Sequence, residues 1–103
     1  MYKLEYLPVA RKDMIEIVRY ISKELKNPVA AESLALELVS AAEGLRKFPY
    51  STPVYQPARP LKHQYRKIPV RNFLIFYWVN EEEKLVTVAR VMYARRDYDR
   101  LLK

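Results

Sequence analysis

The chain has 103 residues, half of them hydrophobic, and its nineteen Lys and Arg against twelve Asp and Glu give a net charge of +7. We expect residues 1–103 to form one domain, because this length supports a single core. No apolar run reaches membrane-spanning length, and the charged N-terminus lacks the apolar segment of a signal peptide, so we expect a cytoplasmic protein with no membrane partner. Without cysteine, the chain has no disulfide, thiolate metal site or thiol nucleophile.

The positive charge lies mostly in the second half of the chain. Residues 1–50 carry a net charge of +1, whereas residues 51–103 carry +6. This excess indicates a polyanionic or acidic partner such as nucleic acid, the ribosome or an acidic protein segment. The alternative is ordinary solubility charge.

The first half predicts one strand and two helices. Residues 2–6 alternate between apolar and charged side chains, as in a short half-buried strand. From Val9 to Leu25 apolar residues recur at helical spacing. Asn27 is a good N-cap and the proline after it suits a first helical position, so a second helix is expected from Pro28 to about Lys47, its apolar stripe ending at Phe48. Because the connection is short, the helices form an antiparallel pair.

The second half predicts three strands after a proline-rich surface linker over residues 49–64. In the strand at 66–70, Pro69 lacks an amide hydrogen and indicates a sheet edge or a position facing away from the ladder. Arg71 and Asn72 form the corner, where asparagine tolerates the left-handed conformation. The next strand, 73–79, is apolar on both faces and therefore central.

A closing strand is expected at 85–92, followed by a short helix or extended tail at 93–103. The order is β-α-α-β-β-β, an α+β fold with an antiparallel helical hairpin on one face of a small, mainly antiparallel sheet. The other face needs a cover, which we expect from the C-terminal segment, a partner chain, or both.

Several groups of residues are candidates for chemistry. Basic residues from Arg59 to Arg100, with Tyr65, Tyr93 and Tyr98 among them, suit nucleic-acid contact or RNA cleavage. Arg95 and Arg96 follow a strand and could stabilise a phosphorane-like charge, with Tyr93 or Tyr98 moving a proton.

The alternative for that terminal segment is an Arg96 ion pair with Asp97 or Asp99, and an apolar anchor at Leu101 and Leu102. His63, the single histidine, would need an orienting partner to act as a base. A metal site is not expected, because the chain has a single histidine and no cysteine. A cofactor is not expected either, and with one glycine the chain has no Gly-rich phosphate-binding loop.

The ordered set of segments resembles the RelE/ParE superfamily of toxins from bacterial and archaeal toxin–antitoxin pairs. The matching segments are Pro8–Asp13, Ile17–Ile21, Ala30–Glu32, Leu45–Pro49, Tyr65–Val70, Phe73–Tyr77 and Arg90–Asp97. The resemblance implies a small growth-inhibiting, plasmid-stabilising toxin that a cognate antitoxin of the ParD or RelB kind neutralises. It also implies that the antitoxin covers apolar surface and neutralises basic residues.

The superfamily divides by target. Members that cut mRNA on the ribosome use basic residues on the sheet, and Lys67 and Arg96 match two of these positions. Pro69 and Leu74 stand where two further basic residues would be, and Leu102 stands where a late catalytic tyrosine would be. The resemblance is therefore closer to the ParE-type branch, which poisons DNA gyrase without that catalytic set.

We thus expect a gyrase-inhibiting toxin that is not an enzyme. One alternative is a metal-independent, ribosome-dependent mRNA endoribonuclease, and another is a basic nucleic-acid-binding domain. The expected target-binding residues are Arg66, Lys67, Arg71, Arg95 and Arg96, and the expected antitoxin-binding residues are Ile17, Tyr20, Ile21, Phe73, Trp78 and Tyr93. For a ribonuclease, the catalytic candidates are Lys67, Arg71, Tyr93, Arg96 and Tyr98.

Overall fold

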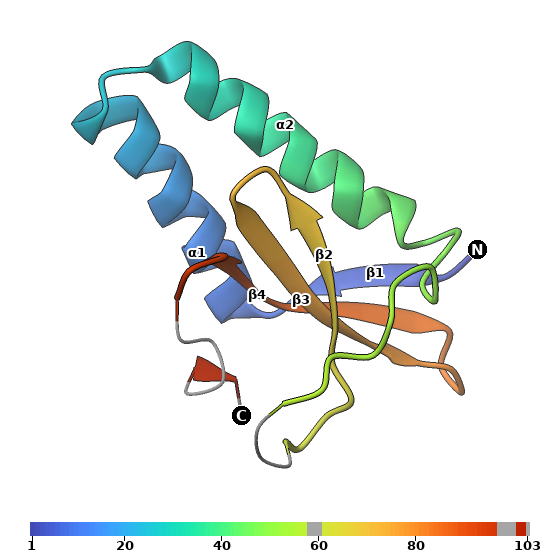
Figure 1. Ribbon diagram of the computed structural model, residues 1–103. Helices are drawn as coiled ribbons and strands as arrows, with labels where there is room; N and C mark the ends of the chain where they lie inside the picture. The colour runs from blue at the N-terminus through green and yellow to red at the C-terminus, as the bar shows by residue number, and fades with distance from the viewer. Residues whose placement is uncertain (58–60, 97–100, 103) are drawn as a thin grey trace.

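The structure, a computed structural model, describes residues 1–57, 61–96 and 101–102. A pair of antiparallel helices lies over one face of a four-stranded sheet (Figure 1). In chain order the elements are β1 (Lys3–Tyr6), α1 (Pro8–Arg19), the π-helical η1 (Tyr20–Glu24), α2 (Pro28–Gly44), β2 (Arg66–Val70), β3 (Phe73–Asn80) and β4 (Leu85–Tyr93). The predicted α+β class and order of elements are confirmed.

The sheet has the strand order β1-β4-β3-β2. Strands β2, β3 and β4 form an antiparallel meander, and β1 pairs in parallel with β4. This places β3 inside the sheet and β2 at its edge, as the apolar pattern of β3 and Pro69 in β2 predicted. The β3–β4 register shifts at Phe76 and Tyr77, which pair with Arg90 and Val88, so that Ala89 is an extra residue in β4.

Both faces of β3 are buried, by different parts of the chain. On the helix side Ile75 packs in a cluster with Leu34 and Leu38 of α2. On the opposite side Phe76 is fully buried and meets the ring of Tyr55 at 5.7 Å. Leu102 packs in that second cluster and is 2% exposed, so the C-terminal segment does cover this face, as expected. Leu7, which follows β1, and Tyr55, Leu61 and Tyr65, which precede β2, supply further cover.

The first helix differs from its prediction at its end. After Arg19 the chain continues as a π-helix, in which the Leu25 amide donates to the Tyr20 carbonyl at 3.1 Å. Because a π-turn contains an extra residue, the side chains after it rotate away from the α-helical stripe. The prediction that Leu25 continues the buried stripe is therefore wrong, and its side chain is 57% exposed.

The second helix begins as predicted and ends earlier. The Asn27 side chain accepts a hydrogen bond from the Ala30 amide at 3.1 Å, which confirms the N-cap. The helix ends at Gly44, and bonds to the carbonyl three residues earlier tighten the following turn, as from the Leu45 amide to Ala42. Phe48 then lies outside the apolar stripe and is 67% exposed, which corrects the prediction that it ends the stripe.

The corner between β2 and β3 uses the opposite residue from the one expected. Arg71 takes the left-handed conformation, with φ of 54°, whereas Asn72 does not. An arginine adopts this conformation at a steric cost, and its guanidinium contacts Ser33 and Glu37 of α2. Most of the predicted terminal helix or tail, including residues 97–100, lies outside the described residues. No helix in the described ranges is both long and apolar enough to cross a membrane.

Candidate functional site

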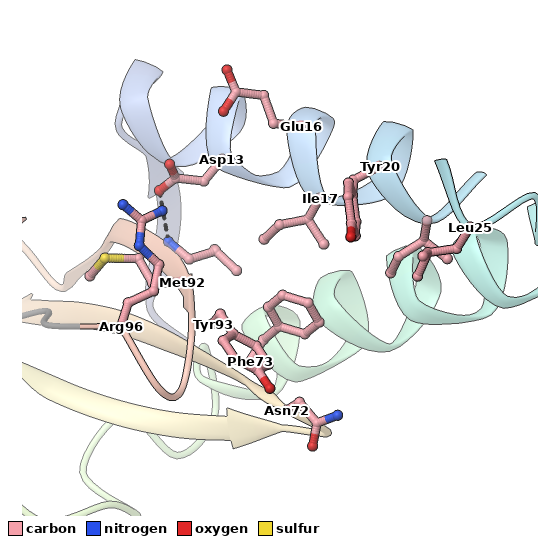
Figure 2. A pocket seen from close by; sticks show the side chains of 12 residues that line it. Asp13, Glu16, Ile17, Tyr20, Leu25, Asn72, Phe73, Met92, Tyr93 and Arg96 are labelled. Carbon is pink, nitrogen blue, oxygen red and sulfur yellow. Dashed lines mark hydrogen bonds between the residues drawn. The ribbon is translucent and has the colours of Figure 1, made fainter. Parts of the chain in front are cut away.

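A hollow in the described part of the molecule lies between the first helix and the end of the sheet where the β2–β3 corner meets the end of β4. We call it the tip groove; it encloses about 600 Å³. Figure 2 shows helical side chains on one side of it and the sheet's side chains on the other. Its lining consists of Asp13, Glu16, Ile17, Tyr20, Ile21, Leu25, Asn72, Phe73, Val91, Met92, Tyr93 and Arg96.

Local backbone features shape this groove. The π-turn leaves Tyr20 56% exposed, at the helical rim. On the sheet side, Phe73 and Tyr93 are cross-strand partners whose rings meet edge to face, with centroids 5.8 Å apart. The Ala94 amide donates to the Asn72 carbonyl at 2.8 Å and holds the chain after β4 against the corner. The groove is therefore largely apolar and aromatic.

One carboxylate fixes the first helix to the sheet at the inner end of the groove. Asp13 accepts two hydrogen bonds from the Arg90 guanidinium, at 2.8 and 2.9 Å, and a third from the Val91 amide at 3.0 Å. The hydrogen bond with Asp13 raises the pKa of Arg90 further, against the opposing effect of burial. This pair is absent from the sequence-based candidates, because Asp13 lies among charged residues of the first helix and reads as part of its polar face.

The expected antitoxin-binding residues fall into two places. Five of the six line the tip groove, namely Ile17, Tyr20, Ile21, Phe73 and Tyr93. The sixth, Trp78, lies on the opposite sheet face, where its indole stacks on the His63 ring with centroids 3.6 Å apart and planes 7° apart. The alternation of β3 explains the split, because Phe73 and Trp78 are an odd number of residues apart.

The surroundings of the stacked ring also shift the pKa of His63. Burial lowers the pKa of His63, and the charge of Lys62 lowers it further. The Tyr65 ring stands edge-on to both stacked rings. His63 is thus part of the cover over the second face of the sheet.

The expected target-binding residues do not form one patch. Arg71 turns to α2, where its Nε lies 2.6 Å from a Glu37 oxygen and its Nη2 donates to Ser33 at 2.8 Å. Arg66 donates to the Thr52 carbonyl and lies 4.9 Å over the Tyr50 ring, and Lys67 lies 5.1 Å over the Tyr55 ring.

Arg95 and Arg96 follow β4 and are exposed, and within the described part of the chain neither forms an ion pair. Of the ribonuclease candidates, the tip groove brings together Tyr93 and Arg96. Tyr98 lies outside the described residues, as do Asp97 and Asp99, the two acids considered as partners of Arg96. The described ranges contain no group of three or more side chains that could hold a metal ion.

A polar cluster at the other end of the sheet was also not predicted from the sequence. Glu81 accepts hydrogen bonds from Tyr2 at 2.7 Å and Tyr50 at 2.6 Å, and pairs with Lys84. These bonds, that from Lys84 foremost, lower the pKa of Glu81 to about 2, and the bond to Glu81 raises the pKa of Tyr50 to about 12. The cluster ties β1, the 49–52 loop and the β3–β4 turn together, so its role is structural.

Comparison with known proteins agrees with this architecture. In the chromosomal ParDE toxin–antitoxin system of P. aeruginosa, the matching chain has 16% identity and a TM-score of 0.74, over 92% of this chain and 98% of that chain. In the RelBE2 toxin–antitoxin complex of Mycobacterium tuberculosis, the matching chain has 18% identity and a TM-score of 0.60, over 89% of this chain and 96% of that chain. In the intact E. coli RelBE complex they are 21% and 0.53, over 93% and 100%. At these identities the likeness is one of fold.

The search of curated proteins found no significant match. The model of a protein family, by contrast, matches residues 4–98, nearly the whole chain, from the second residue of β1 to beyond the end of β4. That model describes the ParE toxin of the type II toxin–antitoxin system parDE. The chain therefore belongs to the ParE toxin family of type II toxin–antitoxin systems.

Proposed function

We propose that this toxin acts by binding rather than by catalysis, with DNA gyrase as its target, and that a cognate antitoxin neutralises it by occupying the tip groove. The cytoplasm, where gyrase and DNA are found, is the proposed location. The observation that supports binding rather than catalysis is an apolar pair on the sheet, at the place where RNA-cleaving members of the superfamily are expected to carry charge.

That pair is Pro69 and Leu74, which are direct cross-strand partners in β2 and β3. Leu74 is 9% exposed and packs in the second-face cluster with Phe76 and Leu102. A buried leucine and a proline supply neither a proton nor a positive charge to a ribose or phosphate. Leu102, at the position of the expected late tyrosine, is itself buried in the same cluster.

The remaining candidates also support binding over cleavage. Arg71 is held by Glu37 and Ser33 on α2, so its guanidinium is directed away from the tip groove that holds Tyr93 and Arg96. A general base and a charge-stabilising group must both reach the reacting atoms. Tyr93 and Arg96 alone are the observation that keeps an endoribonuclease as the second candidate.

The tip groove suits an antitoxin segment. Its walls carry the exposed rings of Tyr20 and Tyr93, and amphipathic segments commonly dock in such apolar grooves through large side chains. Arg96 lines the groove together with Glu16 and has no ion pair in the described ranges, so it can pair with a carboxylate of that segment.

The target is tested with the purified toxin in a gyrase supercoiling reaction, next to primer-extension mapping of translated messages after induction in cells. Gyrase inhibition that added antitoxin reverses, without cuts located at codons, supports the proposal. Unchanged supercoiling from a toxin that still stops growth overturns it, and codon-located cuts would assign the ribonuclease function instead.

The antitoxin site is tested separately by titrating the cognate antitoxin against Tyr20→Ala and Tyr93→Ala. Loss of a central aromatic contact weakens an interface by about tenfold or more, and we expect that here. Phe48→Ala is the matched control, because Phe48 is an exposed aromatic residue that does not line the groove. Equal affinity for all three variants would show that the antitoxin binds elsewhere.

A further inference from the structure

The face of the sheet opposite the helices carries a hollow of its own, which we call the tryptophan pocket. It encloses about 430 Å³ between the start of α1, the loop before β2, and strands β3 and β4. The rings of Trp78, His63 and Tyr65 line it, together with the cations Lys62 and Arg90. None of its lining residues lines the tip groove, so the two hollows are separate sites.

The tryptophan pocket offers a flat aromatic surface. The Trp78 indole and the His63 imidazole stack with their centroids 3.6 Å apart and their planes 7° apart, and the Tyr65 ring stands edge-on to both. Both stacked rings are half-buried and line the pocket, so a further flat ring can continue the stack. Nucleobases have such flat faces, and they stack on aromatic side chains whatever their sequence.

The charge of the tryptophan pocket suits a phosphate attached to that ring. Lys62 is exposed, follows directly before His63 in the chain, and has no ion pair within the described ranges. Arg90 is neutralised by Asp13, so Lys62 supplies the net positive charge. No Asp or Glu among the described residues lines this pocket. A phosphate beside a stacked base would therefore meet a cation and no lining carboxylate.

Three other hollows in the described part of the chain lack this combination. The tip groove contains aromatic rings, but Asp13 and Glu16 also line it. The hollow between the two helices has Arg19 among its lining residues but no aromatic ring. The hollow beside β1 contains Glu5 and Glu43 as well as cations. Carboxylates repel a phosphate and aliphatic side chains offer no flat face, so the tryptophan pocket is the one of the four that suits a nucleotide.

We infer that the tryptophan pocket binds a nucleobase with its phosphate, the base stacking on the Trp78–His63 pair and the phosphate lying beside Lys62. A free nucleotide and a single strand of DNA or RNA share this chemistry, whereas the bases of a duplex are already stacked on both faces. This binding goes beyond the proposed action on gyrase and the proposed antitoxin site, and it depends on neither.

Occupancy of the tryptophan pocket can be measured directly, because Trp78 is the single tryptophan of the chain. The full-length toxin is titrated at low salt with adenosine monophosphate, with a DNA strand of about 12 nucleotides and with the same strand in RNA, while Trp78 fluorescence is followed. We expect saturable quenching, and the ligand that binds most tightly identifies the source. A DNA strand of equal length without bases should bind about tenfold or more weakly, because it cannot stack.

A matched pair of valines tests the location. Val9 and Val29 each follow the proline that begins a helix, and they are 40% and 79% exposed, but Val9 alone lines the tryptophan pocket. Val9→Glu places a carboxylate in the pocket and should raise the Kd of the strand by about tenfold or more. Val29→Glu adds the same charge elsewhere, and its effect should stay within about threefold because salt screens distant charges.

A pair of lysines tests the phosphate contact. Lys62→Ala should weaken binding of the strand and lower the slope of log Kd against log salt by about 0.7, the value for one phosphate contact in a single strand. Lys47→Ala removes the same charge from an exposed position outside the pocket and should leave the slope unchanged. All four variants should keep the thermal unfolding transition of the wild type, because the altered side chains are exposed.

Three results would overturn the inference. The first is unchanged Trp78 fluorescence with every nucleotide and strand. The second is equal binding of the strand without bases, or equal quenching by poly-glutamate, since either would show that the toxin recognises negative charge alone. The third is equal affinity of Val9→Glu and Val29→Glu, which would place the site elsewhere. The assay contains neither gyrase nor antitoxin, so its failure leaves the proposed function standing.

Discussion

Replacing Asp13 by alanine tests how the first helix is fixed to the sheet. The substitution removes three hydrogen bonds, two from the Arg90 guanidinium and one from the Val91 amide. The Asp13 and Arg90 side chains are 12% and 19% exposed, so the arginine would be left largely buried without its partner. Breaking a buried pair costs about 3–5 kcal/mol, and the partial exposure of Arg90 places the expected loss near the lower end, at about 3 kcal/mol.

The assay is urea unfolding followed by circular dichroism. In thermal unfolding of a domain of this size, the same loss of unfolding free energy corresponds to a fall in Tm of roughly 10–20 °C. Glu32→Ala is the control, because it removes the same charge from an exposed helical position with no ion pair in the described ranges, and it should cost less than about 0.5 kcal/mol.

A double-mutant cycle with Arg90→Met then isolates the interaction. Removing both partners leaves no buried unpaired charge, so the double variant should be more stable than the sum of the single effects predicts, by about 1.5–3 kcal/mol. A loss below about 1 kcal/mol for Asp13→Ala, or additive effects in the cycle, would refute the reasoning.

Three other predictions concern the second sheet face and the far cluster. Leu102→Ala should cost about 2–4 kcal/mol in urea unfolding, because it leaves a cavity beside Phe76, and a near-neutral effect would show that the C-terminal segment is not an anchor. In an NMR titration the Glu81 carboxyl should have a midpoint of about 2. Because its pKa is lowered, its bonds stabilise the fold fully above its ordinary pKa of 4.5, and this stabilisation is lost as pH falls toward 2. A midpoint near 4.5 would contradict the hydrogen bonds of the cluster. The fluorescence of Trp78, the single tryptophan, should change as His63 titrates below pH 6.5, and His63→Gln should abolish the change. Since the folded pKa of His63 is lowered, its contribution to stability is present above about pH 6.5 and is lost as pH falls; a midpoint above 6.5 would contradict burial of the ring.

Much of the fold follows from local patterns in the sequence. Asn27 before a proline fixes the start of the second helix, and it is the observed N-cap. The two-sided apolar run of β3 predicts an inner strand, and Pro69 predicts the edge position of β2. Each of these signals acts within a few residues, which is why the sequence alone is sufficient to detect it.

The features that sequence reasoning missed depend on contacts between distant segments. The π-turn at Tyr20 changes which side chains reach the tip groove, and residue spacing assumes regular helical turns. Arg71 takes the left-handed conformation next to partners on α2, which the corner sequence does not reveal. The pair of Asp13 and Arg90 joins residues 77 positions apart.

The candidate site shows the same division. The sequence placed five of the tip-groove side chains in one predicted antitoxin-binding set, three from the first helix, Phe73 from the central strand and Tyr93 from the segment after the closing strand. It placed Trp78 with them, although the alternation of β3 directs that side chain to the opposite face. The exposed positions of Leu36 and Val39 were missed because the pattern of α2 was assigned to a single buried stripe.

The measurement that tests the central claim most directly is a supercoiling reaction with purified gyrase, relaxed plasmid and increasing toxin, repeated with the cognate antitoxin present. We predict that supercoiling falls as toxin is added and recovers when antitoxin is in excess. Full supercoiling at toxin concentrations that arrest growth in cells would contradict the account.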